Sequence, residues 1–176
     1  MVCLTLVTVM GCEADSFINR DSTVYFAFSY SDYPTSQLFV AAQNPGSYAF
    51  VWTRGDGKST PRHVYVQIND GKTPLEDNII TNAILNNLRY LLGSYNEIGL
   101  IVGCTNHNGR WAYDRCCPNC TVYRALQWTG NRQKVVCNEC HRVYDLETSD
   151  IIEGDQGASL RRYYCTYNGV LLEVKN

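Results

Sequence analysis

The chain has 176 residues, of which 45% are hydrophobic and 18% are charged, so it is long enough for one domain with a substantial apolar core. A formal net charge of -2 offers no basic field of the kind that nucleic-acid binding requires. Nine cysteines are present, an odd number that argues against a framework in which every cysteine forms a disulfide.

The first segment, residues 1–11, is almost wholly apolar or small and is too short to span a bilayer as a helix. It is typical of the apolar part of a signal peptide. Val9-Met10-Gly11-Cys12 resembles a bacterial lipobox, in which Cys12 is lipidated and becomes the new N-terminus, and the polar residues 12–22 would then form a solvated tether. The alternative is a buried first strand. The pattern predicts a lipid-anchored, extracytoplasmic protein of the bacterial cell envelope.

Alternation of apolar and polar residues predicts strands in the part of the chain that follows. In residues 23–30 the alternation is clean, with Val24, Phe26 and Phe28 on one face. Further strands are predicted at residues 38–42, 48–53 and 63–68. Turn sequences rich in Gly, Asn, Asp and Pro separate these strands.

One helical insertion is predicted at residues 73–92. Thr73-Pro74-Leu75-Glu76 fits a capping box with Pro at the first helical position, and Gly93 would end the helix. Apolar residues recur near helical spacing at Leu75, Ile79, Ala83, Leu88 and Leu92. We expect this helix to pack against the sheet, because its several Asn residues would be costly in a membrane.

Strands dominate again toward the C-terminus. They are predicted at residues 98–104, 110–114, 121–128, 133–137, 142–146, 160–167 and 170–174. The chain is therefore expected to be all-β and antiparallel, as a single domain over residues 23–176.

Two cysteine pairs carry the chemistry of this sequence. Cys117-Pro118-Asn119-Cys120 and Cys137-Asn138-Glu139-Cys140 are separated by sixteen residues. A Cys-x-x-Cys turn lets two thiolates reach one metal, and two such turns close a tetrahedral site. Two disulfides, or buried thiols that merely cluster, are the alternatives. The spacing predicts a metal site formed by Cys117, Cys120, Cys137 and Cys140.

Several neighbouring residues have roles that the spacing leaves open. Cys116 is an alternative ligand to Cys117, although the Cys-x-x-Cys geometry favours Cys117. His141 is a candidate for a hydrogen bond to a cysteine sulfur. Cys104 and Cys165 fall in predicted strands, as a disulfide or as free thiols.

Asp114 and Asp145 each lie beside one of the two cysteine turns. We expect their carboxylates to hydrogen-bond the turn backbone rather than to act as a catalytic acid or base.

The order of elements from Gly99 onward resembles the Rieske iron–sulfur family. Gly99-Leu100-Ile101-Val102, Trp111-Ala112-Tyr113-Asp114, the two cysteine turns, Val143-Tyr144-Asp145 and a closing strand follow in the family's order. The resemblance covers about residues 99–174. It implies an antiparallel Rieske-like sandwich with a metal-binding subdomain at about residues 112–148, and the two turns also resemble those of rubredoxins and zinc ribbons.

The sequence departs from this family at its ligands. Cys117 and Cys137 stand where the family has cysteines, whereas Cys120 and Cys140 stand about where it has histidines, and His141 takes the place of a Gly. Four thiolates suit Zn²⁺, mononuclear iron or a low-potential 2Fe–2S cluster. We expect structural zinc in a binding or structural module, with an electron-transfer protein as the alternative.

Evidence for an enzyme is weak. No Gly-rich phosphate loop is present, and no spacing of nucleophile and base stands out. The expected partners are a membrane, through the lipid anchor, and a redox or surface protein, but not nucleic acid.

Overall fold

The computed structural model describes residues 23–70 and 72–176. The expected signal peptide (1–11), the tether (12–22) and Cys12 lie outside these residues. The elements, in chain order, are β1 (Tyr25–Ser29), α1 (Gln37–Gln43), β2 (Ser47–Arg54), β3 (His63–Ile68), β4 (Glu76–Ile79), α2 (Ala83–Asn87), β5 (Leu100–Cys104), β6 (Arg110–Asp114), β7 (Gln127–Trp128), β8 (Lys134–Val136), β9 (Val143–Asp145), β10 (Ile151–Glu153), β11 (Arg162–Tyr167) and β12 (Leu171–Lys175). Within the described ranges no helix is long and apolar enough to cross a membrane.

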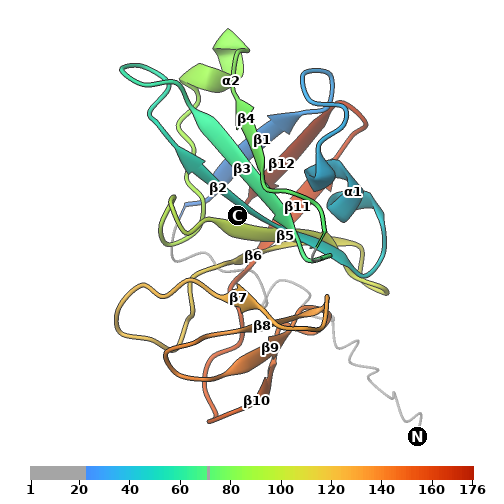
Figure 1. Ribbon diagram of the computed structural model, residues 1–176, viewed down its shortest axis with the longest axis vertical. Coiled ribbons are helices and arrows are strands. Elements are labelled where there is room, and N and C mark those ends of the chain that lie inside the picture. Colours follow the sequence, from blue (N-terminus) through green and yellow to red (C-terminus); the bar gives the residue numbers. More distant parts are fainter. Residues whose placement is uncertain (1–22, 71) are drawn as a thin grey trace, which may run out of the picture.

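These strands form two antiparallel sheets (Figure 1). The large sheet has eight strands in the order β1-β12-β11-β6-β5-β2-β3-β4, and the small sheet has four in the order β10-β9-β8-β7. Because β6 and β11 pair directly, residues 115–161, which contain the whole small sheet, are an insertion between two neighbouring strands of the large one. The predicted β-rich, antiparallel architecture is confirmed.

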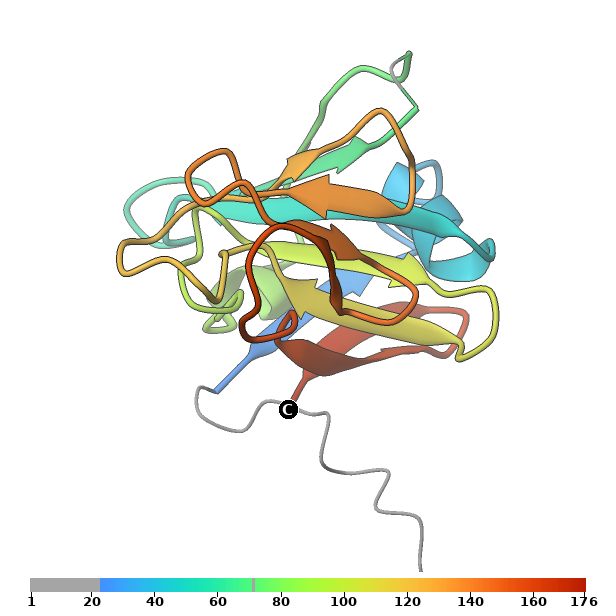
Figure 2. The same cartoon turned by 90° about the horizontal axis from the view of Figure 1, so that it is seen from below.

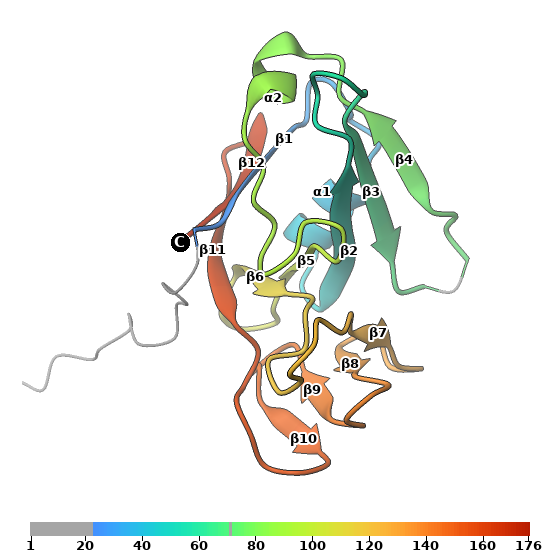
Figure 3. The same ribbon diagram turned by 90° about the vertical axis from the view of Figure 1, so that its left-hand side faces the viewer.

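The large sheet curls, and the small sheet lies against one end of it. Figure 3 shows β1, β11 and β12 on one side, β2, β3 and β4 on the other, and the small sheet beneath them. The inside of the curl holds one core, which we call the inner core and which includes Phe26, Phe28, Leu38, Phe39, Val51, Val102 and Leu172. Figure 2 views the molecule from the side of the small sheet.

A second core, the junction core, joins the two sheets. It contains Tyr48, Phe50, Ile101 and Tyr113 from the large sheet and Leu126, Val135, Tyr144, Leu146 and Leu160 from the insertion. Successive residues of a strand point to opposite faces of a sheet. On β2, Val51 therefore faces the inner core and Phe50 the junction core. The middle of β2 (residues 48–51) and the first part of β5 (residues 100–102) are apolar because both faces of these strands are buried.

The strand predicted at residues 38–42 is wrong: this segment is helix α1. Ser36 is its N-cap, and the Ser36 hydroxyl accepts a hydrogen bond from the backbone N–H of Leu38. Leu38, Ala41 and Ala42 are buried at positions i, i+3 and i+4, which is a helical face. A short apolar run does not by itself distinguish a strand from a buried helix.

The single helix predicted at residues 73–92 is also wrong. The segment contains strand β4, which pairs with β3, and then the five-residue helix α2, whose N-cap is Asn82. Glu76, predicted to close a capping box, instead accepts hydrogen bonds from Ser36 and from the backbone N–H of Gln37. A contact distant in sequence therefore replaces the local cap, and the described residues contain two short helices, α1 and α2, instead of one helical insertion.

The remaining predicted strands are present with two differences. Residues 63–68 and 110–114 are strands at their predicted bounds. Of residues 121–128 only Gln127–Trp128 is a strand, and β10 at Ile151–Glu153 had not been predicted. Because β10 belongs to the small sheet, the insertion extends past residue 148, which is the expected end of the metal-binding subdomain.

Candidate metal centre

The structure brings the sulfurs of Cys117, Cys120, Cys137 and Cys140 together. All four Sγ atoms lie within 4.8 Å of one another. The Sγ atoms of Cys117 and Cys140 are 3.7 Å apart, and those of Cys120 and Cys137 are 3.6 Å apart. Each of these contacts joins one cysteine turn to the other, so the two turns interleave around a single point. Cys117 and Cys137 are buried, whereas Cys120 and Cys140 are partly exposed.

The first turn follows β6 and is closed by its own backbone. The N–H of Cys117 donates to the carbonyl of Arg124 at 2.8 Å, and the N–H of Asn119 donates to the Cys117 sulfur. Pro118 has a fixed φ and no N–H, which suits a tight turn in which no donor is needed at that position.

The second turn joins β8 to β9 as the end of a hairpin. The N–H of His141 donates to the carbonyl of Cys137 at 2.8 Å, and the N–H of Arg142 donates to the Cys140 sulfur. His141 has a φ of 58°, in the left-handed region that favours Gly. The His141 side chain is exposed.

Electrostatics favour a bound cation at this group of thiols. Burial raises the pKa of Cys117, and burial together with the neighbouring sulfurs raises the pKa of Cys120. Burial also acts to raise the pKa of Cys140, but hydrogen bonds from Arg142 outweigh it and lower that pKa to about 6. Four thiolates this close repel one another, and a bound metal ion removes that penalty.

Two side chains that the sequence did not single out as site residues support the first turn. The Tyr144 hydroxyl lies 3.3 Å from the Cys117 sulfur, and Asn119 donates to the same hydroxyl at 2.8 Å. Asn119 also exchanges two hydrogen bonds with the backbone of Ala158. The only sequence signal for Tyr144 was its place in the Val-Tyr-Asp stretch.

Hydrogen bonds and ring stacking fix the centre to the large sheet. The hydroxyls of Tyr48 and Tyr113 both donate to the carbonyl of Leu146, at 3.1 Å and 2.6 Å. The Phe50 and Trp128 rings stack with their centroids 3.8 Å apart. These hydrogen bonds and this stacking, together with the two chain connections, hold the insertion against the large sheet.

The shared acceptor at Leu146 predicts non-additive effects of two substitutions. In Tyr113→Phe the Leu146 carbonyl keeps the Tyr48 donor, so we expect a loss of about 1 kcal/mol in the free energy of unfolding. We expect Tyr48→Phe to cause a similar loss in the free energy of unfolding. The double variant leaves the buried Leu146 carbonyl unpaired. Its loss in free energy of unfolding should therefore exceed the sum of the losses in the two single variants by about 1 kcal/mol. Urea unfolding of the four proteins measures this, and strict additivity would contradict it.

The other predicted residues lie outside the group of four sulfurs. Cys116 is buried, and its N–H donates to Asp114, while the exposed ring of His141 is not part of the group. Cys104 and Cys165 are free thiols. They lie on β5 and β11, on either side of β6, so their backbones are about 10 Å apart, which is too far for a disulfide.

Asp114 bonds the backbone beside the first cysteine turn, as predicted, whereas Asp145 bonds the backbone of the turn that follows β9. Asp114 accepts from the N–H of Cys116 at 2.9 Å. Asp145 accepts from the N–H groups of Glu147 and Thr148.

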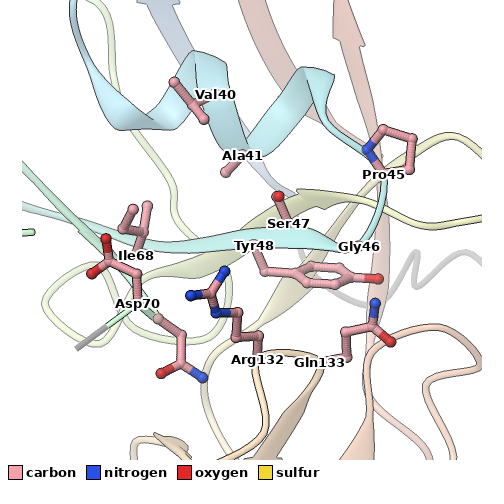
Figure 4. Close-up of a pocket in the computed structure, with 11 residues that line it drawn as sticks. Val40, Ala41, Pro45, Gly46, Ser47, Tyr48, Ile68, Asp70, Arg132 and Gln133 are labelled. Atoms are coloured by element: carbon pink, nitrogen blue, oxygen red, sulfur yellow. The ribbon is translucent and has the colours of Figure 1, made fainter. Parts of the chain in front are cut away.

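A separate cavity of about 220 Å³ lies under α1, where β2 begins. Figure 4 shows Arg132 and Gln133 reaching toward Tyr48 from below, with Val40 and Ala41 above. The Tyr48 hydroxyl is already bonded to Leu146, and no group of metal-ligating side chains lines this cavity within the part of the chain that the structure describes. The cysteine group is thus the best-formed candidate site.

No protein-family model, no curated protein and no solved structure matches the chain. Its function is therefore argued from the site itself.

Proposed function

We propose that this chain is a zinc-binding structural module in which one Zn²⁺ ion, held by Cys117, Cys120, Cys137 and Cys140, fixes the small sheet against the large one. The observation that carries the proposal is the mutual approach of the four sulfurs to within 4.8 Å. A chain with this site would present a rigid β surface to a partner rather than catalyse a reaction.

The sulfur spacing suits one tetrahedral ion. A Zn–S bond of about 2.3 Å gives a tetrahedron whose sulfurs are about 3.8 Å apart. The Cys117–Cys140 and Cys120–Cys137 pairs, at 3.7 Å and 3.6 Å, match this edge. Four protein ligands leave no open position for water or substrate, which is the arrangement of a structural and not a catalytic zinc site.

The same spacing argues against a 2Fe–2S cluster. Such a cluster places two irons and two sulfides between its two pairs of thiolates, so sulfurs on different irons lie farther apart than sulfurs around one ion. Here every pair of sulfurs lies within 4.8 Å, including pairs that join one turn to the other at 3.7 Å and 3.6 Å. Mononuclear iron has the same tetrahedral geometry as zinc and is the second candidate, and it would make the module an electron carrier.

Metal analysis with an absorption spectrum, on protein purified without oxygen, tests the proposal. We expect one equivalent of zinc, no visible absorption, and a fall in thermal midpoint when a chelator removes the ion. One iron with visible bands would establish the electron carrier instead. Two irons with labile sulfide, or a metal-free protein that takes up no zinc, would contradict the single-ion site.

We also propose that the module is held at a bacterial envelope membrane through lipidated Cys12, and that its β domain is of Rieske type. The lipobox-like sequence and the order of motifs in residues 99–174 support these two statements. A Cys12→Ala variant expressed in a bacterial host should move from the membrane fraction to the soluble fraction. If Cys12→Ala stayed in the membrane fraction, the lipid anchor would be contradicted. The proposal for the metal site would not be affected by that result.

A further inference from the structure

A second cavity, of about 590 Å³, lies at the end of the large sheet away from the cysteine group. Its walls are the turn between β2 and β3 and the chain segment after α2, which lie together at that end of the molecule (Figures 1 and 3). The side chains that matter here are those of Asp56, Lys58, Arg62, Arg89 and Tyr90.

Arg62 is a buried cation that has no acidic partner among the residues that the structure describes. The residue is only 7% exposed, and its guanidinium donates to the carbonyls of Leu85, Leu88 and Asp56 and lies 4.4 Å from the centre of the Tyr90 ring. All of these acceptors are neutral backbone groups. Buried charges in proteins are normally paired with an opposite charge, and no carboxylate of the described residues forms an ion pair with Arg62.

Two further cations line the same cavity. Lys58 and Arg89 are exposed, and neither forms an ion pair within residues 23–70 and 72–176. The acidic residue in the lining is Asp56, whose Oδ1 already accepts the backbone N–H groups of Lys58, Ser59 and Thr60 at 2.9–3.0 Å. The lining therefore carries three cations and one carboxylate, of which one oxygen already accepts backbone hydrogen bonds.

We propose that this cavity binds the oxyanion group, a carboxylate or a phosphate, of a small soluble molecule. A guanidinium has five N–H donors, and the three bonds to carbonyls leave two of them for a ligand. Arg62 would supply a charge-assisted hydrogen bond from a desolvated position, where such bonds are strong. Lys58 and Arg89 would add their charges from the rim.

A purely structural role for Arg62 accounts for only part of this arrangement. Its bonds to the carbonyls of Leu85 and Leu88 stabilise the C-terminal end of α2. That role does not require Lys58 and Arg89 to be gathered at the same cavity. The two rim residues, and not Arg62, are therefore the positions at which ligand binding is tested without disturbing the fold.

Titration of the ¹⁵N-labelled full-length protein with inorganic phosphate, and separately with acetate, tests the site. Both are added as sodium salts at constant ionic strength. We expect saturable shifts of the backbone amide signals of Gly55, Gly57 and Leu91 with at least one of the two anions, and the tighter anion identifies the ligand class. In Lys58→Gln/Arg89→Gln the dissociation constant should rise about tenfold, because each exposed charge contributes a factor of a few.

The matched control is Lys72→Gln/Arg132→Gln, which removes the same charges at the opposite end of β3. Its dissociation constant should stay within about twofold of that of the unmodified protein. The proposal is overturned if neither anion binds at millimolar concentration, if the rim variant binds as tightly as the unmodified protein, or if the control variant loses binding equally.

Discussion

A Cys137→Ser variant is expected to lose its metal and most of the stability of the insertion. Cys137 is fully buried, and its sulfur lies 3.6 Å from that of Cys120. Structural zinc contributes on the order of 10 kcal/mol to the folding of small domains. Serine cannot replace the thiolate, so the two turns would no longer be held together and four sulfur ligands would become three.

We expect this damage to reach the large sheet. The insertion covers Tyr48, Phe50 and Tyr113, which would become exposed if the small sheet detached. A loss of 1 kcal/mol lowers the thermal midpoint of a domain of this size by about 2–4 °C. A fall of more than about 10 °C, with less than one equivalent of metal, is therefore the expected result.

Cys104→Ser is the matched control for this experiment. It makes the same chemical change at a partly exposed thiol outside the metal group. Its metal content should equal that of the unmodified protein, with little change in thermal midpoint. If Cys137→Ser kept a full equivalent of metal and an unchanged midpoint, the four-thiolate assignment would be wrong.

The second large effect is expected at Asp114, which is completely buried at the end of β6. Its carboxylate accepts hydrogen bonds from the Ser94 N–H and hydroxyl, from the Cys116 N–H and from the Tyr163 hydroxyl, and it lies 3.7 Å from the guanidinium of Arg161. One side chain thus connects β6, the loop after residue 93, β11 and the first cysteine turn.

Asp114→Ala should lower the free energy of unfolding by about 3–5 kcal/mol, because it leaves buried donors without an acceptor. Asp114→Asn keeps the shape but loses the charge, so it should cost less, about 1–3 kcal/mol. Urea unfolding with the metal bound measures both. A loss below 1 kcal/mol in the alanine variant would contradict this reading of the network.

Asp155→Ala is the control for Asp114. The Asp155 side chain is 93% exposed and lies 4.0 Å from Arg142, so this ion pair is worth little. Its removal should change the free energy of unfolding by less than about 0.5 kcal/mol. A comparable loss in both variants would mean that net charge, and not the buried network, sets the stability.

Local patterns in the sequence were sufficient for most strands and for the grouping of the cysteines. In β3 the alternation of Val64 and Val66 with more exposed residues marks a strand regardless of its partners. A Cys-x-x-Cys turn is likewise determined within four residues. The pairing of two such turns follows from the need of four thiolates for one ion.

Tertiary contacts determine the secondary structure of the two segments for which the prediction is wrong. Residues 38–42 are apolar enough for either a strand or a helix, and their burial against the inner core selects the helix. Residues 73–92 carry a capping signature, but Glu76 is used by Ser36 and the segment pairs with β3. Helix signals worth about 1 kcal/mol are outweighed by pairing and burial.

What the sequence by itself determined, therefore, is which four cysteines come together and the β character of the chain. The tertiary structure alone decided that the centre lies in an insertion between β6 and β11, that Asp114 joins four segments, and that Arg62 is buried without an acid. The reason is physical: ligand spacing and strand periodicity act over a few residues, whereas burial and charge pairing depend on residues that only folding brings together.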